Sequence, residues 1–167
     1  MIQSFRDIEI DGLGLPEINL DLLNPAVRQQ CERIWVEFFG TAPLAGSTSN
    51  LPANRAYKPG GTFTGIMNSL CGRFQTSRSN PHGLGRWSFV QLYGKDGKSL
   101  VMITAYRVCN GNISTSGSST AFHQQWHLLR LAGHLKPNPR KACILPTHRC
   151  HQEVADHSWW LFQRMPR

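Results

Sequence analysis

The chain has 167 residues, of which 40% are hydrophobic, and this length and composition suit one globular domain with its own core. The formal net charge of +8 and the pI of about 9.7 favour a polyanionic partner such as nucleic acid, although residues 136–167 alone carry half of that charge. The sequence contains no run of about 18 apolar residues, so we expect no transmembrane helix. It also contains no basic segment ahead of an apolar block, so we expect no signal peptide. We therefore expect an intracellular protein without a membrane partner, and nuclear and cytoplasmic locations both stay open.

The first half of the chain combines predicted strands with one helix. Residues 7–15 alternate and then become apolar, as in a strand that runs into Pro16 and Glu17. Asn24 is expected to cap a helix over residues 25–39, which Gly40 ends. Its apolar stripe consists of Val27, Cys31, Ile34, Trp35 and Phe38. Residues 42–49 and 62–67 are predicted strands, whereas residues 51–61 and the polar residues 75–85 are predicted loops.

The second half begins with a predicted β-hairpin. In residues 86–93 one face carries Trp87 and Phe89 and the other carries Val90 and Leu92, so we expect this strand to be covered on both sides. The loop GKDGK leads into an apolar partner strand that ends at Tyr106. After a loop over residues 109–119, a helix is predicted up to Gly133, and its core stripe is Phe122, Trp126, Leu129 and, more loosely, Leu128. This order of elements predicts an α/β fold with a mixed, largely antiparallel sheet.

Four residues stand where strand ends present polar groups. The Glu17 carboxylate can hold a hard cation such as Mg²⁺ or Mn²⁺, and Asn19 can orient a phosphate. The Tyr106 phenol can donate to a phosphate oxygen, and the Arg107 guanidinium can bind two oxygens. Plainer explanations exist for three of them: a loop glutamate, a tyrosine that caps the core and a solvated arginine. Likewise, Lys58 precedes the pair Gly60-Gly61, which is typical of an ordinary turn.

Residues 143–167 read as a separate, irregular basic tail. The five cysteines of the chain are odd in number and scattered, which favours reduced thiols. The tail contains Cys143, His148, Cys150, His151 and His157. These residue types suggest zinc, but their spacing matches no closed site, and chance is the alternative. One hypothesis is that the tail is out of frame, because a shifted frame at Met165-Pro166 permits Asp-Ala; the nucleotide sequence tests it.

Several motifs, in the right order, resemble the endonuclease/exonuclease/phosphatase superfamily with its deoxyribonuclease-I-like fold, and most nearly the endonuclease domains of LINE-type retrotransposons. They are LGLPEINLD at 13–21, PGGTFTGIMN at 59–68, GLGRWSFVQLYGKDGKSLVMITAYRVC at 83–109, and QQW at 124–126 followed by NPRK at 138–141. The resemblance covers about residues 7–142. It implies a Mg²⁺-dependent DNA phosphodiesterase in which Glu17 binds the metal and Tyr106, with Arg107, stabilises charge on the phosphate.

The resemblance also implies that residues 1–142 are the N-terminal half of such a domain. The family carries an Asp-x-Asn motif and an Asp-His pair for metal binding and acid–base chemistry. No Asp-x-Asn follows residue 107, and Asp156-His157 spells the right dipeptide without a strand to support it. We therefore expect a fragment of a retroelement-derived nuclease, inactive by itself. Its oligomeric state stays open, and a lipid or nucleotide phosphatase shares this first half.

A different class of function is a noncatalytic module that binds nucleic acid or protein through the basic tail and aromatic residues such as Trp159 and Trp160. Binding that falls steeply with salt, survives Glu17→Ala and disappears when residues 143–167 are deleted would favour this alternative. A nonfunctional product is a third possibility, and failure to obtain any folded protein would favour it.

Overall fold

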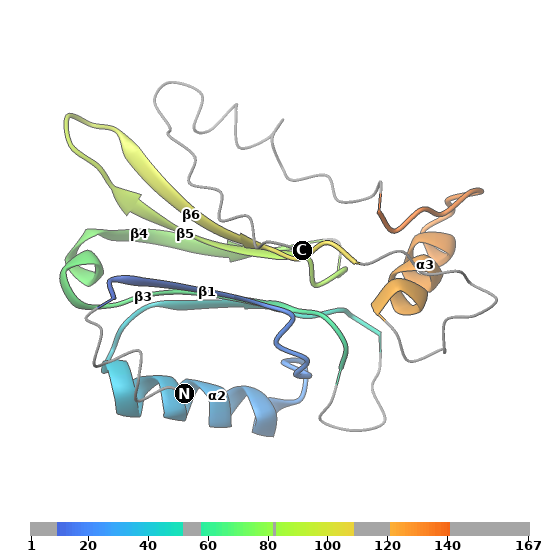
Figure 1. The fold of residues 1–167 in the computed structure, drawn as a ribbon, viewed down its shortest axis with the longest axis horizontal. Helices are drawn as coiled ribbons and strands as arrows, with labels where there is room; N and C mark the ends of the chain where they lie inside the picture. Colours follow the sequence, from blue (N-terminus) through green and yellow to red (C-terminus); the bar gives the residue numbers. More distant parts are fainter. Residues whose placement is uncertain (1–9, 52–57, 82, 109–120, 141–167) are drawn as a thin grey trace.

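The computed structural model describes residues 10–51, 58–81, 83–108 and 121–140 (Figure 1). The elements, in chain order, are β1 (Gly12–Pro16), α2 (Pro25–Phe39), β2 (Leu44–Ser47), β3 (Thr62–Ile66), the 3₁₀ helix η1 (Asn68–Arg73), β4 (Phe74–Ser79), β5 (Trp87–Tyr93), β6 (Ser99–Ala105) and α3 (Ala121–Leu131). The predicted loop over residues 109–119, the possible zinc ligands and the whole tail from residue 143 lie outside these residues.

The strands form two three-stranded sheets that pack face to face (Figure 1). The strand orders are β1-β3-β2 and β4-β5-β6, and each pairing among the described strands is antiparallel. The predicted α/β class with largely antiparallel pairing is therefore confirmed. Strand β1 lies so close to β6 across the sandwich that a Cβ atom on Gly14 would come within 2.6 Å of Thr104 Oγ1. Glycine at this position thus permits the close approach of the two sheets.

The space between the sheets is apolar at one end and hydroxyl-rich at the other. At the apolar end, buried Ala45, Ile66, Val90 and Leu92 pack against partly buried side chains from η1 and β6. The hydroxyl-rich end holds Thr62, Thr64, Ser88 and Thr104. There Thr64 Oγ1 donates to Thr104 Oγ1 at 2.7 Å, and Thr62 Oγ1 donates to Ser88 Oγ at 3.1 Å. These bonds offset the cost of burying the hydroxyl groups.

Both faces of β5 are buried, as its sequence predicts. Val90 and Leu92 point into the sandwich. On the opposite face the rings of Trp87 and Phe89 stack with their centroids 5.8 Å apart, next to Val101 of β6. Trp87 and Phe89 are only 6% and 4% exposed. The hairpin therefore packs on its two sides rather than presenting one polar face to solvent.

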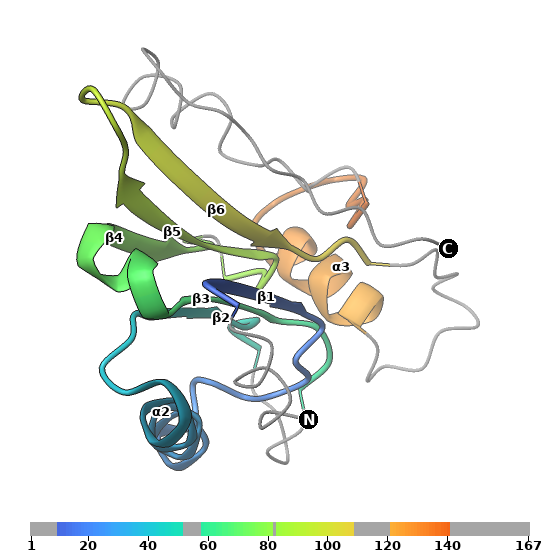
Figure 2. The same cartoon turned by 60° about the vertical axis from the view of Figure 1, so that its left-hand side comes forward.

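Helix α2 covers the outer face of the sheet that contains β1, β3 and β2 (Figure 2). Its boundaries and cap are as predicted: the Asn24 side chain accepts a hydrogen bond from Ala26 N at 3.0 Å, and Gly40 ends the helix. The predicted apolar stripe is half-buried rather than fully buried. Trp35 anchors it, because its Nε1 donates to Ala42 O at 2.7 Å and its ring lies against Gly65 of β3.

Two sequence predictions are wrong. The polar residues 75–85 are not all loop, because β4 occupies Phe74–Ser79 and pairs with β5. This strand is a largely exposed edge, so backbone pairing rather than an apolar pattern forms it. In α3 the buried residues are Ala121, Gln125 and Leu129, so the aromatic residues of the predicted core stripe flank the buried face. Within the described residues, no helix has the length and apolar content needed to cross a membrane.

Candidate functional site

Two of the predicted site residues meet at one rim of the sandwich, where β1 and β6 both end. Glu17 follows the last residue of β1, and Tyr106 follows the last residue of β6. The Tyr106 hydroxyl donates to Glu17 Oε1 at 3.4 Å, which joins residues 89 positions apart in the sequence. This distance is long for an O–H···O bond, and Glu17 is exposed. The contact is therefore a weak one, and the Glu17 carboxylate remains accessible to solvent.

The loop that carries Glu17 has an unusual backbone. Glu17 and Asn19 both have left-handed conformations, with φ of 58° and 56°. Such a conformation costs a residue other than glycine about 1 kcal/mol or more, although asparagine tolerates it better. Backbone strain of this kind persists only where surrounding contacts impose it, and it concentrates at functional sites.

A ladder of hydrogen bonds imposes this conformation. Asn19 N donates to Gly60 O at 2.8 Å, and Lys58 N donates to Asn19 O at 3.2 Å. The Asn19 side chain adds a third bond, since its Oδ1 accepts from Gly60 N at 3.0 Å. Gly60 and Gly61 have φ of 85° and 83°, so the glycine pair turns the second loop toward the first. Asn19 thus holds the loop together, and its side-chain oxygen is occupied within the protein.

A buried ion pair fixes the base of the same loop. Lys58 is fully buried, and its Nζ lies 2.7 Å from Asp21 Oδ1 and 2.8 Å from Ser49 O. Asp21 Oδ1 also accepts from Leu23 N at 3.1 Å. A buried charge is tolerated only when it is paired and hydrogen-bonded. Sequence reasoning noted Lys58 but missed this pair, because no local pattern connects Asp21 with a lysine in another loop.

The backbone around Tyr106 is equally constrained. Tyr106 N donates to Arg86 O at 2.7 Å. Its ring packs on Gly60, where a Cβ atom would lie 3.2 Å from Tyr106 Cε1. The predicted partner Arg107 is exposed, and within the described part of the chain no hydrogen bond or ion pair joins it to Glu17, Asn19 or Tyr106. The structure therefore brings Glu17 and Tyr106 together and holds Asn19 in the same loop as Glu17, whereas no described contact places Arg107 at the pair.

The residues at the rim fit one mode of magnesium binding. Among the residues that the structure describes, no group of three or more His, Cys, Asp and Glu side chains could hold a metal ion. Mg²⁺ is nevertheless commonly bound through one or two carboxylates, with waters and substrate phosphate oxygens completing its coordination. The exposed Glu17 carboxylate can supply such a single protein ligand.

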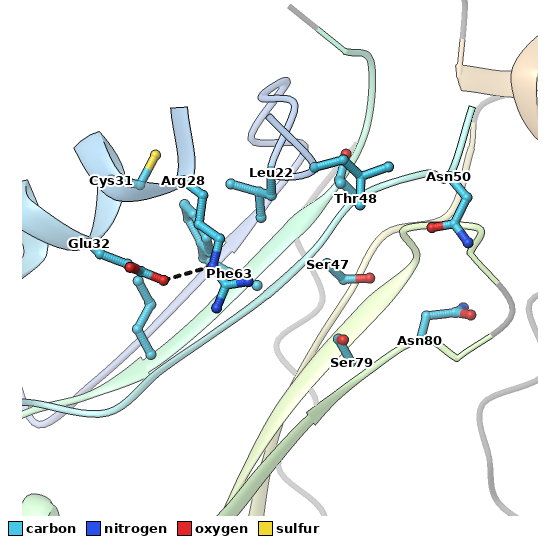
Figure 3. Close-up of a pocket in the computed structure, with 13 residues that line it drawn as sticks. Leu22, Arg28, Cys31, Glu32, Ser47, Thr48, Asn50, Phe63, Ser79 and Asn80 are labelled. Atoms are coloured by element: carbon cyan, nitrogen blue, oxygen red, sulfur yellow. Dashed lines mark hydrogen bonds and ion pairs between the residues drawn. The ribbon is translucent and has the colours of Figure 1, made fainter. Parts of the chain in front are cut away.

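A separate pocket of about 340 Å³ lies between α2, β2 and the end of β4 (Figure 3). It contains the exposed ion pair between Arg28 and Glu32, with 2.8 Å between Arg28 Nε and Glu32 Oε1. Cys31 also lines it, but burial and then the nearby Glu32 charge raise the pKa of this thiol. A protonated thiol is a poor nucleophile. None of the four predicted site residues lines this pocket, so the rim is the better candidate for chemistry.

Comparisons with known proteins give little beyond this geometry. No family model matches the chain, and no curated protein matches it. Among solved structures, the chain is similar to the crystal structure of an endonuclease/exonuclease/phosphatase from Beutenbergia cavernae, with a TM-score of 0.40 and 14% identity. The match covers 81% of this chain and 38% of that chain, so the chain spans less than half of that protein. At this level of similarity, a functional inference depends on the residues of the rim.

Proposed function

We propose that this chain carries one half of a metal-dependent phosphodiesterase site of the endonuclease/exonuclease/phosphatase type, with DNA as its substrate and a retroelement as its origin. The observation that carries the proposal is the meeting of Glu17 and Tyr106 at the ends of β1 and β6. The sequence motifs around these two residues resemble those that supply the metal-binding glutamate and the phosphate-binding tyrosine of that superfamily.

Each residue has a defined role in this proposal. Glu17 binds Mg²⁺ or Mn²⁺, which when bound withdraws charge from the phosphoryl oxygens. The Tyr106 hydroxyl donates a hydrogen bond to an oxygen of the scissile phosphate, where negative charge grows as water attacks. Arg107 adds positive charge beside that phosphate. Asn19, with its side-chain oxygen bound to Gly60 N, orients the loop that presents Glu17, and its side-chain NH₂ group donates to a phosphate oxygen.

The described part of the site does not contain all the groups that such a phosphodiesterase needs. No Asp-x-Asn motif lies among the described residues, and no Asp-His pair precedes residue 143. Within the described residues, β1 pairs with β3 and β6 pairs with β5, so each of them is an edge strand of its sheet there. A second segment that extends both sheets would bring the remaining groups to this rim.

The nucleotide sequence of the locus and transcript, read from codon 130 onward, is the first part of the test. A frame that continues into Asp-x-Asn and a later Asp-His pair supplies the completing segment, and that longer chain is then assayed for Mg²⁺-dependent nicking of supercoiled DNA. We expect nicking by the longer chain but none by the 167-residue chain. Lack of any such frame would remove the phosphodiesterase proposal for this locus.

Two variants of the longer chain test the assigned roles. Glu17→Gln should abolish nicking, and Tyr106→Phe should lower its rate about 10²-fold, which is typical for the loss of one hydrogen bond to a transition state. Matched controls are Glu32→Gln on the exposed face of α2 and Tyr93→Phe, whose ring is 59% exposed at the opposite end of β5. Equal activity of Glu17→Gln and Glu32→Gln would contradict the proposal.

A further inference from the structure

Helix α3 lies across the rim end of both sheets with an unusually polar buried face (Figures 1 and 2). Gln125 is 2% exposed, and its Nε2 donates to Leu84 O at 3.1 Å. Next to it, Ser49 Oγ donates to Gln124 Oε1 at 3.2 Å. These bonds fix the rotation of α3 about its axis. The fixed rotation keeps the two aromatic residues of the helix, Phe122 and Trp126, out of the fully buried face.

Phe122, Trp126 and Arg130 follow one another at four-residue spacing and therefore form a single stripe along α3. Both aromatic residues are half-buried, and Arg130 is exposed. The Arg130 Cζ lies 5.3 Å from the centroid of the Trp126 ring, within the range of a cation–π contact. The stripe thus presents aromatic surface and a guanidinium group to solvent side by side.

The charged side chains of the segment that carries this stripe all have one sign. Residues 121–140 include Arg130, Lys136 and Arg140 but no aspartate or glutamate. Arg130 and Lys136 are exposed. Cations interleaved with aromatic rings complement a strand of phosphates and bases, and the lack of acidic side chains in residues 121–140 suits a polyanion. The charge pattern therefore favours nucleic acid.

We propose that the α3 stripe, formed by Phe122, Trp126 and Arg130, binds single-stranded nucleic acid. An unpaired base stacks on the exposed aromatic surface or on the Arg130 guanidinium plane, and Arg130 and Lys136 contact the flanking phosphates. A base inside a duplex hides its face in the stack, so the α3 stripe selects unpaired strands. This inference goes beyond the proposed function, because it requires neither a metal nor cleavage.

The α3 stripe lies next to the candidate site. A Cβ atom on Gly60, which packs against Tyr106, would lie 3.6 Å from the Cβ of Ala121 at the start of α3. Phe122 is the next residue of the helix. The N-terminal end of the stripe therefore lies at the same rim as Glu17 and Tyr106.

Fluorescence anisotropy of a fluorescein-labelled 12-nucleotide oligo-dT, titrated with the full 167-residue chain in EDTA, tests the proposal. Loss of one stacking contact in Trp126→Ala should weaken binding about 10-fold, and Trp126→Phe should recover most of it, because any aromatic face can stack. Arg130→Gln should lower the magnitude of the slope of log K against log salt concentration by about 0.7. Arg33→Gln, an exposed arginine on α2, is the matched control and should leave both quantities unchanged.

Three results would overturn the proposal: wild-type affinity of Trp126→Ala, equal affinity for a duplex of the same length, or equal effects of Arg33→Gln and Arg130→Gln. If Trp126→Ala does not fold, photocrosslinking of the wild-type chain to an oligonucleotide that contains 5-iodouracil decides the question. We expect crosslinks at Phe122 or Trp126, and crosslinks confined to other segments would refute the assignment. Because EDTA removes metal, a failure here is distinct from a failure of metal-dependent nicking in the longer chain.

Discussion

Lys58→Met is expected to lower the stability of the folded chain by about 3 kcal/mol. Lys58 is fully buried, and its Nζ contacts Asp21 Oδ1 at 2.7 Å and Ser49 O at 2.8 Å. Methionine keeps most of the side-chain volume but leaves a carboxylate that is only 11% exposed without its counterion. Breaking such a pair costs about 3 to 5 kcal/mol, and the remaining hydrogen bond from Leu23 N to Asp21 favours the lower end.

Urea unfolding followed by circular dichroism measures this change. With an m-value of about 2 kcal/mol/M, the midpoint should fall by about 1.5 M. The double variant Lys58→Met/Asp21→Leu should lie within about 1 kcal/mol of the wild type, because replacing both charges by apolar groups removes the desolvation cost as well. Arg28→Met, which breaks the exposed pair between Arg28 and Glu32, is the control and should cost about 0.5 kcal/mol or less. A cost for Lys58→Met as small as for Arg28→Met would refute this reasoning.

Three further predictions concern stability and thiol chemistry. Asn24→Ala removes the cap that accepts from Ala26 N and should cost about 1 kcal/mol in the same unfolding assay, with no change in m-value. The Glu17→Gly variant should be about 0.5 to 1 kcal/mol more stable to unfolding than Glu17→Ala, because φ is 58° at this position and glycine adopts that conformation without strain. Equal free energies of unfolding would show that the backbone is unstrained. Burial raises the pKa of the Cys31 and Cys71 thiols, so at pH 8 both should react more slowly with iodoacetamide in the folded chain than in urea, as followed by mass spectrometry of the labelled peptides. These protonated thiols contribute stability that is present below the thiol pKa of the unfolded chain and is lost as pH rises through the higher pKa of the folded chain. An increase in the free energy of unfolding over that alkaline range would contradict the raised thiol pKa.

The sequence predicts elements best where the signals that define them are local. Helix α2 begins after Asn24 and ends before Gly40 as predicted, because a cap residue and a glycine act within a few residues of the helix ends. The β5–β6 hairpin is likewise predicted, since its loop joins adjacent strands. Strand β4 is missed because its polar residues become a strand only through backbone pairing with β5.

The sequence likewise predicts the local features of the candidate site better than its tertiary contacts. The positions of Glu17 and Tyr106 at strand ends follow from the local pattern, but their approach to 3.4 Å depends on how the two sheets pack. The burial of Gln125 in α3, in place of the aromatic residues, depends on loop carbonyl groups from another part of the chain. The ion pair between Lys58 and Asp21 likewise depends on contact between two loops that are distant in the sequence. Contacts of this kind are set by tertiary structure and leave no periodic trace in the sequence.

The proposed function requires that the Glu17 carboxylate at the rim binds a divalent cation. The most direct test is a titration of the ¹⁵N-labelled chain with Mn²⁺, in which paramagnetic broadening of amide NMR signals reports proximity to the ion. We expect that signals from Glu17, Asn19, Gly60 and Tyr106 broaden first, and that Glu17→Gln removes this effect whereas Glu32→Gln does not. Broadening that begins around Glu32 or Asp96, or that persists unchanged in Glu17→Gln, would contradict the claim.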